Sequence, residues 1–293
     1  MIRRFIYIFI FMVPLMAQSI TVLSYNIWNG FDWSKDTVRH DKTVAWIKSQ
    51  NPHVVALQEL CGYTEDKLKT DAKEWGHKYS ILLKTDGYPV GLTSKRPIQL
   101  KEKVRDGMWH RMLHGETFGV DFFVVHLSPS DVNFRIKEAD IIRKKVQNIS
   151  NERFILLGDF NALSLHDKEA MKTKTALLSQ HRESAKSNKK GHSNLRNDAF
   201  DFSVMAEFLS LPTVDVCYLL MKKRDRFSFP TPALLGKYRY KQRQDLQTYR
   251  RRIDFILASP SLAKLCTAAN IYNGENTRLL SDHYPVMAKF ELQ

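Results

Sequence analysis

Several short apolar runs in this chain end in, or begin at, a polar residue that can do chemistry. A chain that built only a core would place a further apolar residue at these positions. The polar residues are Asn26, Glu59, His126, Asp159, Asn161, Asp254, Asp282 and His283. In an antiparallel pair, the start of one strand lies at the same edge of the sheet as the end of its neighbour. We therefore expect these residues to meet at one rim.

Carboxylates gathered at one rim would repel one another. The acids of this set are Glu59, Asp159, Asp254 and Asp282. A cation or a protonated histidine among them would relieve the repulsion. The expected ligands are carboxylate and amide oxygens without a cluster of cysteines and histidines, which suits a hard ion that keeps several waters. We therefore predict a Mg²⁺ site, which Mn²⁺ or Ca²⁺ would also suit, and we do not expect zinc.

The elements that must position these residues are short strands that alternate with helices. The expected strands are residues 20–25, 54–57, 79–83, 89–93, 99–104, 108–113, 119–127, 154–157, 253–258 and 285–292. The expected helices are residues 35–50, 64–75, 132–149 and a segment near 200–209, while 164–197 is expected to form a helix followed by a mobile loop.

Three details of this pattern can be compared with a structure. In the helix over 35–50, Val38, Trp46 and Ile47 are expected to share an apolar face. The three β-like runs between residues 79 and 104 look like neighbouring strands. A hairpin is expected to turn at Gly115-Glu116-Thr117.

The order of these elements predicts the class of fold. Several strands follow one another too closely for helical crossovers, which favours a mixed sheet or a pair of packed sheets with helices outside. No internal repeat is present, which argues against a solenoid. The chain has 293 residues, 43% of them hydrophobic, enough for one large domain. We expect a layered α/β sandwich.

The first residues have the layout of a secretory signal. Arg3 and Arg4 precede an apolar run over residues 5–16, and Ala17-Gln18 follows before the first expected strand. The alternative is an uncleaved membrane anchor, but the run is shorter than the roughly 20 apolar residues of a spanning helix. We predict a signal peptide over 1–18, one domain over 19–293, and a secreted or periplasmic protein.

The cysteines and the net charge indicate the state of the thiols and the kind of partner that the protein binds. Cys61, Cys217 and Cys266 share no spacing typical of a metal site and allow at most one disulfide, so we expect buried free thiols. The formal net charge is +14. Such an excess favours anionic partners such as nucleic acid, anionic lipid headgroups or sulfated glycans, although general solubility is the alternative explanation.

Six short strings of the sequence together resemble the ordered signature of the endonuclease/exonuclease/phosphatase superfamily. They are Ser24-Tyr25-Asn26-Ile27, Leu57-Gln58-Glu59, Val125-His126-Leu127, Gly158-Asp159-Phe160-Asn161, and the segments 252–257 and 281–286. Residues 91–98 also resemble an internal strand and turn of that family. Each string alone is a weak signal, but the set appears in the family's order from residue 24 to 286. The resemblance implies a four-layer α/β sandwich of the DNase I-like type, with two packed mixed sheets flanked by helices and the site between them.

The resemblance also implies a role for each matched position. Glu59 matches the main metal ligand, with Asn26 and Asp282 close to the metal or its waters. His283 matches the histidine that activates or positions the attacking water, and Asp254 the carboxylate that orients this histidine. An aspartate behind an imidazole fixes the tautomer and stabilises the charged ring.

Three further matched positions are expected to lie beside the phosphorus. Asp159 would aid proton removal from water or bind a second cation, and Asn161 would donate to a phosphate oxygen. His126 resembles the histidine of the DNase I, sphingomyelinase and inositol phosphatase branches, which faces the phosphate. The implied reaction is in-line attack of water on phosphorus, without a covalent enzyme intermediate.

The substrate stays open at this point. Basic clusters at 222–226, 239–243 and 250–252, with tyrosines interleaved, are typical of nucleic-acid binding but equally of a solvated face. We predict substrate contacts from His110 and Arg251, and His114 is a further candidate to line the cleft. Three hypotheses remain: a phosphodiesterase acting on nucleic acid or lipid headgroups, a phosphomonoesterase acting on a sugar or inositol phosphate, and a catalytically silent anion-binding module. No obligate protein partner is inferred.

Overall fold

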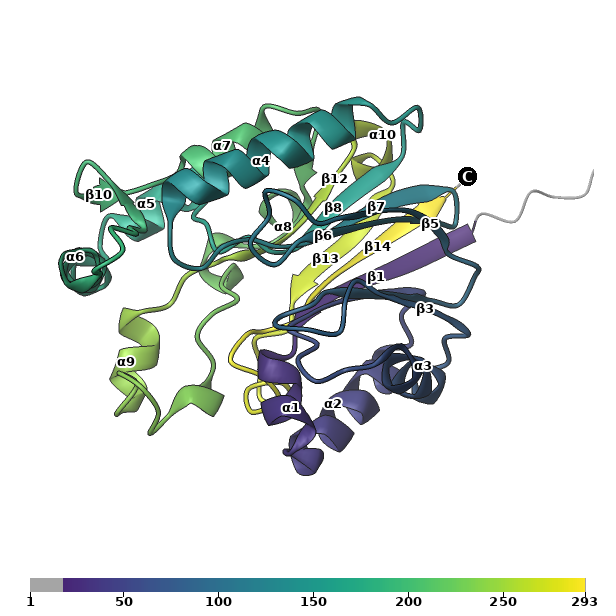
Figure 1. Cartoon of the computed structure of the whole chain (residues 1–293), viewed down its shortest axis with the longest axis horizontal. Coiled ribbons are helices and arrows are strands. Elements are labelled where there is room, and N and C mark those ends of the chain that lie inside the picture. Colours follow the sequence, from purple (N-terminus) through teal and green to yellow (C-terminus); the bar gives the residue numbers. More distant parts are fainter. Residues whose placement is uncertain (1–17, 293) are drawn as a thin grey trace, which may run out of the picture.

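The computed structural model describes residues 18–292 and contains two six-stranded mixed sheets (Figure 1). The first has the order β13 (Cys266–Ile271), β14 (Val286–Leu292), β1 (Gln18–Asn26), β2 (Val54–Gln58), β4 (Gly91–Ser94), β3 (Tyr79–Leu82). The second has the order β11 (Val214–Asp215), β12 (Asp254–Ala258), β8 (Phe154–Asp159), β7 (Val120–His126), β6 (Met112–Thr117), β5 (Gln99–Val104).

Helices cover the outer face of each sheet. In Figure 1, α2 (Thr37–Gln50) and α3 (Glu65–Glu74) lie below the first sheet, and α4 (Val132–Gln147) and α7 (Ser203–Leu209) lie above the second. The two sheets and the two helical layers form the predicted four-layer α/β sandwich, so the fold class is confirmed.

Alternation along the strands separates three apolar cores, because successive side chains of a strand point to opposite faces. In β1, Val22 belongs to the core between the sheets, whereas Leu23 and Tyr25 pack with Trp46 of α2. Leu157 of β8 likewise joins the central core, and its neighbours pack against α4 and α7. The inner strands β2, β7, β8 and β12 are therefore buried along their whole length, which explains why they are nearly continuous apolar runs.

The pairing of the strands brings their polar ends to one edge. In the second sheet, β8 is parallel to β7 and antiparallel to β12, which places His126 and Asp254 on either side of Asp159. In the first sheet, β1 is parallel to β2, and Asn26 is in register with Gln58, the residue before Glu59. Strand β14 is antiparallel to β1 and begins just after His283. The predicted single rim is thus drawn from both sheets.

Three sequence expectations are wrong in detail. Val38 is exposed, and α2 buries Arg39 and Thr43 beside Trp46 and Ile47 instead. The run over 99–104 does not neighbour β3 and β4: it crosses to the second sheet as β5 and pairs with β6. The hairpin turns at Phe118-Gly119, where both residues have positive φ, so residues 115–117 continue β6.

The rest of the chain contributes short elements around the second sheet and the rim. They are α1 (Trp28–Ser34), α5 (Lys168–Met171), α6 (Thr175–Ser187), β9 (Leu195–Arg196), β10 (Ala199–Phe200), α8 (Val216–Leu220), α9 (Arg243–Thr248), α10 (Pro260–Ala263) and three 3-10 turns at Leu165–Asp167, Lys223–Asp225 and Pro232–Leu234. The sequence predicted the helix α6 but not the strand β13 or the helices α1, α8 and α9.

Residues 1–17 of the predicted leader lie outside the described residues, and its last residue, Gln18, begins β1. Within residues 18–292, no helix has both the length and the apolar character needed to cross a bilayer. In the same range Cys61, Cys217 and Cys266 are free thiols, the first two buried, as expected from their spacing.

Gly158 is the position of β8 that tolerates no side chain. Its φ is +140°, and a Cβ atom would lie 2.0 Å from the carbonyl oxygen of Val125 on β7. We predict that Gly158→Ala lowers the free energy of unfolding by about 3 kcal/mol or more, because backbone strain and overlap add together. Urea denaturation followed by circular dichroism measures this.

Gly119 provides the matched control for that substitution. It also has a positive φ of +70°, but nothing lies within 4 Å of a Cβ built there. Gly119→Ala should cost only the backbone strain, about 1 kcal/mol. Equal losses for the two variants would contradict the close approach of β8 and β7.

Candidate active site

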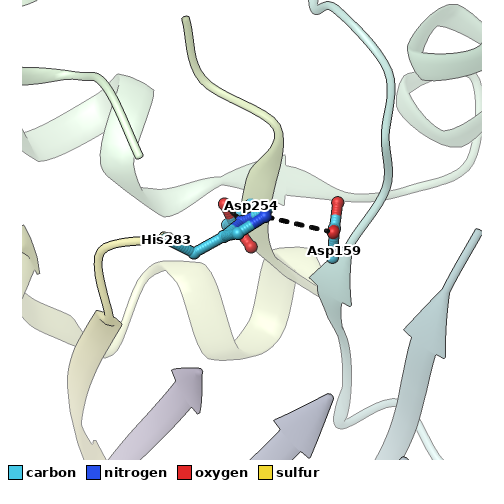
Figure 2. A group of neighbouring side chains, drawn as sticks. All are labelled: Asp159, Asp254 and His283. Carbon is cyan, nitrogen blue, oxygen red and sulfur yellow. Dashed lines mark hydrogen bonds and ion pairs between the residues drawn. The ribbon is translucent and has the colours of Figure 1, made fainter. Parts of the chain in front are cut away.

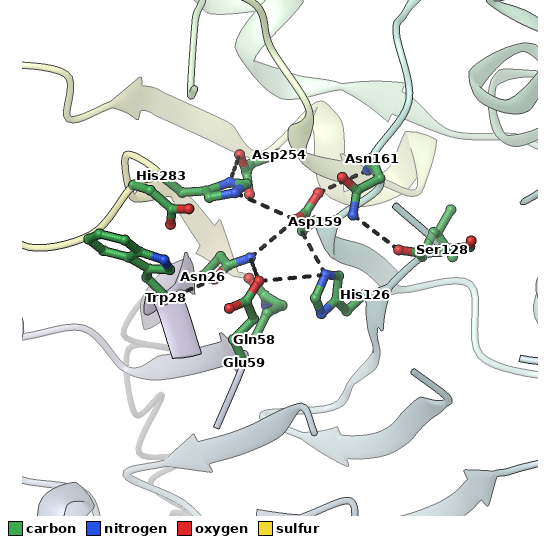
Figure 3. A network of polar contacts seen from close by, with 12 residues as sticks. Asn26, Trp28, Gln58, Glu59, His126, Ser128, Asp159, Asn161, Asp254 and His283 are labelled. Atoms are coloured by element: carbon green, nitrogen blue, oxygen red, sulfur yellow. Dashed lines mark hydrogen bonds and ion pairs between the residues drawn. The ribbon is translucent and has the colours of Figure 1, made fainter. Parts of the chain in front are cut away.

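Asn26 lies at the centre of the rim and joins the two sheets. Its Nδ2 atom donates to Glu59 Oε1 and to Asp159 Oδ2, each at 3.1 Å (Figure 3). Its Oδ1 atom accepts from the backbone N–H of Trp28 at 3.0 Å. Because Asn26 and Glu59 follow strands of the first sheet and Asp159 ends a strand of the second, this one amide links the sheets at the place where acids gather.

His283 lies between two aspartates. Its Nδ1 is 2.9 Å from Asp254 Oδ2, and its Nε2 is 3.7 Å from Asp159 Oδ2 (Figure 2). Burial alone would lower the pKa of His283, but the carboxylates of Asp254, Asp159 and Asp282 outweigh burial and raise it to about 10. The surrounding carboxylates therefore favour the cationic ring, and Asp254 fixes its orientation.

The pKa values of two acids of the cluster, Asp159 and Asp282, are also raised. Burial raises the pKa of Asp159 to about 7, and the charges of Asp254 and Glu59 add to this rise. Burial also raises the pKa of Asp282 to about 7, again with a contribution from Glu59. Acids that hold protons near neutral pH are typical of functional sites, because their charge is uncompensated.

His126 faces the same acids from the end of β7. Its Nε2 lies 3.6 Å from Asp159 Oδ2 and 3.9 Å from Glu59 Oε1. Burial, together with the neighbouring rings of His110 and His283, lowers its pKa well below the usual value. Its Nδ1 is buried without a hydrogen-bond partner in the described structure. His126 is thus a neutral ring whose second nitrogen is unsatisfied, which is unusual for a structural histidine.

Asn161 is fixed by two hydrogen bonds. Its backbone N–H donates to Asp159 Oδ1 at 2.9 Å, and its Nδ2 donates to the carbonyl oxygen of Leu127 at 3.1 Å. Its φ is +47°, in the left-handed region. The second N–H of the amide is not used in these contacts, so Asn161 retains a donor beside Asp159.

A left-handed helical segment sets the position of Glu59. All residues of α1 have φ between +51° and +69°. The backbone N–H of Asn29 donates to Glu59 Oε2 at 2.7 Å, and Glu59 itself has a φ of +61°. A Cβ on Gly30 would lie 2.0 Å from the carbonyl oxygen of Cys61, so the segment packs directly on the turn after Glu59.

Arg39 of α2 stabilises this unusual segment. Its Nη1 donates to the carbonyl oxygens of Ile27 and Leu280, and its Nη2 donates to that of Trp28 at 2.8 Å. The guanidinium also lies 5.1 Å from the ring of Trp28. No sequence pattern indicates this role, because only the tertiary structure places Arg39 next to carbonyls as distant in the chain as that of Leu280.

His110 packs on a residue of the rim, whereas His114 does not, and the predicted substrate contact of His110 stays a prediction. The rings of His110 and His126 are stacked with centroids 4.2 Å apart. His114 instead pairs with Asp121 at 2.6 Å and lies on the ring of Phe123. In the strand β6, His114 is buried against β7, so a role in the cleft is excluded by its position.

A buried glutamate that the sequence did not single out anchors the histidine loops. Glu138 of α4 accepts the backbone N–H groups of Trp109 at 2.8 Å and Ser128 at 2.9 Å. Trp109 precedes His110, and Ser128 closely follows His126. Burial raises the pKa of Glu138 to about 7. The sequence does not reveal that Glu138 is buried, because glutamates on helices are ordinarily solvated.

The basic clusters divide between structural and free cations. Arg252 is buried and pairs with Asp167 at 2.7 Å and with Asp215 at 2.8 Å, so it is not available to a substrate. Arg251 has no such acid partner within residues 18–292. Its Nη1 donates to the carbonyl oxygen of Tyr249, and its guanidinium lies 4.5 Å from the ring of Phe229. Arg251 therefore remains a candidate for substrate binding.

The donor set fits a hard divalent cation. Asp159, Asp254 and His283 have ligand atoms within 4.8 Å of one another, but the hydrogen bond between His283 and Asp254 already satisfies that pair. Oxygens of Glu59 and Asp159 converge on Asn26 Nδ2, which moderates their repulsion, and the charge of Glu59 also raises the pKa of Asp282. Carboxylate and amide oxygens without cysteine are the ligands that Mg²⁺, Mn²⁺ and Ca²⁺ prefer.

A family model described as the Endonuclease/Exonuclease/phosphatase family matches residues 23–283. The chain belongs to this endonuclease/exonuclease/phosphatase family. The match spans all the rim residues from Asn26 to His283, so the resemblance noted in the sequence is confirmed. No curated protein sequence matches the chain.

Solved structures place this family member among DNase I-like folds. An AP endonuclease from Archaeoglobus fulgidus is 16% identical with a TM-score of 0.66, and the match covers 93% of this chain and 100% of that one. A 3′-5′ exonuclease from Neisseria meningitidis is 19% identical, with a TM-score of 0.64 and coverages of 93% and 100%. A 3′ phosphatase from Neisseria bound to a product DNA hairpin is 17% identical, with a TM-score of 0.62 and coverages of 92% and 99%.

The buried His110 predicts how stability depends on pH. Burial, with a smaller effect of Lys84, lowers the pKa of His110 to about 3. The unfolded chain binds a proton at this residue below about pH 6.5 and the folded chain does not, so stability falls as the pH drops. When the pH falls from 7 to 5, the free energy of unfolding should therefore drop by about 2 kcal/mol less in His110→Phe than in the wild type. Urea denaturation at the two pH values measures it.

His40 gives a control of opposite sign. Its hydrogen bond to Asp71 raises the pKa of His40, so the stability that it contributes is present at low pH and is lost as the pH rises. His40→Asn should therefore make the protein lose more stability than the wild type on acidification. Identical pH dependence of wild type and His110→Phe would contradict a buried neutral ring at position 110.

Proposed function

We propose that this protein is a divalent-metal-dependent phosphodiesterase that hydrolyses nucleic acid by in-line attack of water. One observation carries the proposal: the imidazole of His283 is oriented by Asp254 and points toward Asp159, beside the acids that suit a metal. The family to which the chain belongs comprises, by its name, endonucleases, exonucleases and phosphatases, which all act on phosphate esters.

The residues of the rim divide the work of such a reaction. His283, held by Asp254, orients the attacking water, and Asp159 with its raised pKa exchanges a proton with it. Asn161 and His126 face the phosphate from the second sheet, where the second N–H of the Asn161 amide and the Nε2 atom of His126, which points toward Asp159, donate to its non-bridging oxygens. The rim thus supplies donors where negative charge develops in the transition state.

The metal would be held by Glu59, with Asn26 and Asp282 close to it or to its waters. When bound, Mg²⁺, or Mn²⁺ or Ca²⁺ in its place, supplies positive charge that stabilises the phosphate oxygens in the transition state. The hydrogen bond from Asn29 fixes one oxygen of Glu59, so the other remains directed into the rim.

Nucleic acid is the substrate class that the charge and the relatives favour. The net charge of +14 attracts polyanions, and the solved structures of similar fold are described as an AP endonuclease, an exonuclease and a DNA-bound 3′ phosphatase. Lipid headgroup diesters present the same chemistry to the rim. The predicted leader over residues 1–18 adds the proposal that the enzyme acts after export, in the periplasm or outside the cell.

A panel of substrates tests the reaction class and the metal together. With Mg²⁺, the purified protein should cleave plasmid DNA and bis-p-nitrophenyl phosphate, and EDTA should reduce both rates at least about 100-fold because the phosphate charge is no longer neutralised. Mg²⁺ in excess of EDTA should restore them. Turnover of p-nitrophenyl phosphate alone would favour a phosphomonoesterase. Cleavage of sphingomyelin in preference to DNA would favour a lipid substrate. Activity that survives full chelation would show that the reaction needs no metal.

Two substitutions test the site itself. His283→Ala and Glu59→Gln should each lower kcat for bis-p-nitrophenyl phosphate by about 100-fold or more, since one removes the residue that positions water and the other a metal ligand. Circular dichroism should show an intact fold, because both residues lie at the rim of the sheets. His40→Ala and Glu74→Gln, which change the same residue types away from the rim, should leave kcat unchanged. Near-normal rates in either rim variant would mean that the site lies elsewhere.

A further inference from the structure

A small pocket opens beside Asn161, on the side of the rim away from Glu59 and the expected metal. Its volume is about 60 Å³, and its polar lining comes from Asn161, Arg135, His181, Asn194, Asp201 and Arg251. Asp201, the one acid among them, is paired with Arg196. The other residues belong to the loop after β8, to α4, to α6, to the segment before β9 and to the segment before β12. The pocket thus lies where several elements converge next to a predicted phosphate ligand.

Arg135 reaches this pocket as a buried cation without an acid partner. The side chain is 3% exposed. Its Nη1 donates to the carbonyl oxygen of Ser128 and its Nη2 to Asn194 Oδ1, both at 2.6 Å. Its Nε is buried with no hydrogen-bond partner in the described structure. Nearby carboxylates among the described residues, of which Glu138 has the largest effect, favour the charged form of Arg135, but none forms an ion pair with it. Burial of a guanidinium without a direct ionic partner is costly, and a bound anion would lower this cost.

The acids nearest to Arg135 are engaged elsewhere. Both oxygens of Glu138 accept backbone N–H groups. Asp201 pairs with Arg196 at 2.8 Å. Asp131 caps α4 through the N–H of Phe134 and accepts from Ser193. Within residues 18–292, none of these carboxylates forms an ion pair with Arg135 or Arg251.

The second guanidinium links the pocket to the catalytic residues. Arg251 lies 4.5 Å from the ring of Phe229, and the same ring lies 4.9 Å from that of His283. Phe229 is therefore a common wall for Arg251 and for the histidine that positions water. An anion bound by Arg251 would be held close to the scissile phosphate.

His181 reports the electrostatic character of the pocket. Burial, with smaller effects of the positive charges of Arg251, Arg239 and Arg135, lowers the pKa of His181 to about 3. Burial disfavours any charge, whereas the three guanidiniums disfavour a further cation and would favour an anion. The space corresponds to about four or five water molecules, enough for a tetrahedral oxyanion and too little for a base.

We propose that this pocket is a second anion site that binds a terminal phosphate group of the substrate, next to the phosphodiester that is cleaved. Two guanidiniums match the charge of a dianionic monoester. The pocket is too small to admit a further nucleotide, so a nucleic-acid strand would have to end there with its phosphate. This inference rests on the proposed function for its substrate and narrows it: the preferred nucleic acid carries a terminal phosphate one linkage from the scissile bond.

Dinucleotides with and without a terminal phosphate test this preference. With Mg²⁺, the wild type should hydrolyse at least one of the singly phosphorylated forms, pTpT or TpTp, with a kcat/KM about tenfold or more above that of TpT. Arg251→Gln and Arg135→Gln should bring this ratio close to one. Arg143→Gln, on the outer surface of the same helix α4 as Arg135, removes one positive charge without touching the pocket and should keep the ratio.

A binding measurement separates failure of the pocket from failure of the proposed function. In EDTA, inorganic phosphate should shift the ring ¹⁵N signals of His181 in the wild type, and Arg251→Gln should weaken the apparent Kd about tenfold. If the wild type cleaves all the dinucleotides with equal kcat/KM, the second site is disproved and the phosphodiesterase stands. If no dinucleotide is cleaved, the proposed function fails, and the phosphate titration alone decides whether the pocket binds anions.

Discussion

The repulsion among four buried or half-buried acids is the constraint on which this structure depends. Glu59, Asp159, Asp254 and Asp282 converge at one rim, and burying them together raises the pKa of Asp159 and of Asp282. The amide of Asn26 and the cationic ring of His283 moderate this repulsion. Positive charge stabilises such a rim, so the same repulsion would favour binding of a cation there.

The fold meets this constraint by drawing the acids from two sheets rather than one. Glu59 follows the first sheet, whereas Asp159 and Asp254 lie at the end and the start of neighbouring strands in the second. The central core between the sheets fixes the distance between the two groups, and close-packed interiors do not deform easily. The spacing of the acids is therefore set by apolar residues that do not touch them.

Much of this arrangement could be predicted from the sequence, and the reasons are local. A strand shows itself as a short apolar run, and a polar residue such as Asn26 or Asp159 at its end stands out because it breaks the run. Residues whose role depends on distant contacts could not be found in this way: Glu138 and Arg39 look like ordinary helix surface residues until the fold brings backbone groups to them. The turn at Phe118-Gly119 was misplaced because Gly115, inside β6, gives the same signal as a turn glycine.

The left-handed segment α1 shows why the first sheet needs more than strand ends to build a metal ligand. Left-handed helical backbone costs about 1 to 2 kcal/mol for each residue other than glycine, so this segment is unstable by itself. Three backbone carbonyls bind Arg39, and Gly30 packs on the turn that follows Glu59. In return the segment turns the N–H of Asn29 toward Glu59, whose own backbone is also left-handed. A right-handed helix at this place would direct its first N–H groups along its axis instead, and one oxygen of Glu59 would lose the donor that orients the other toward Asn26.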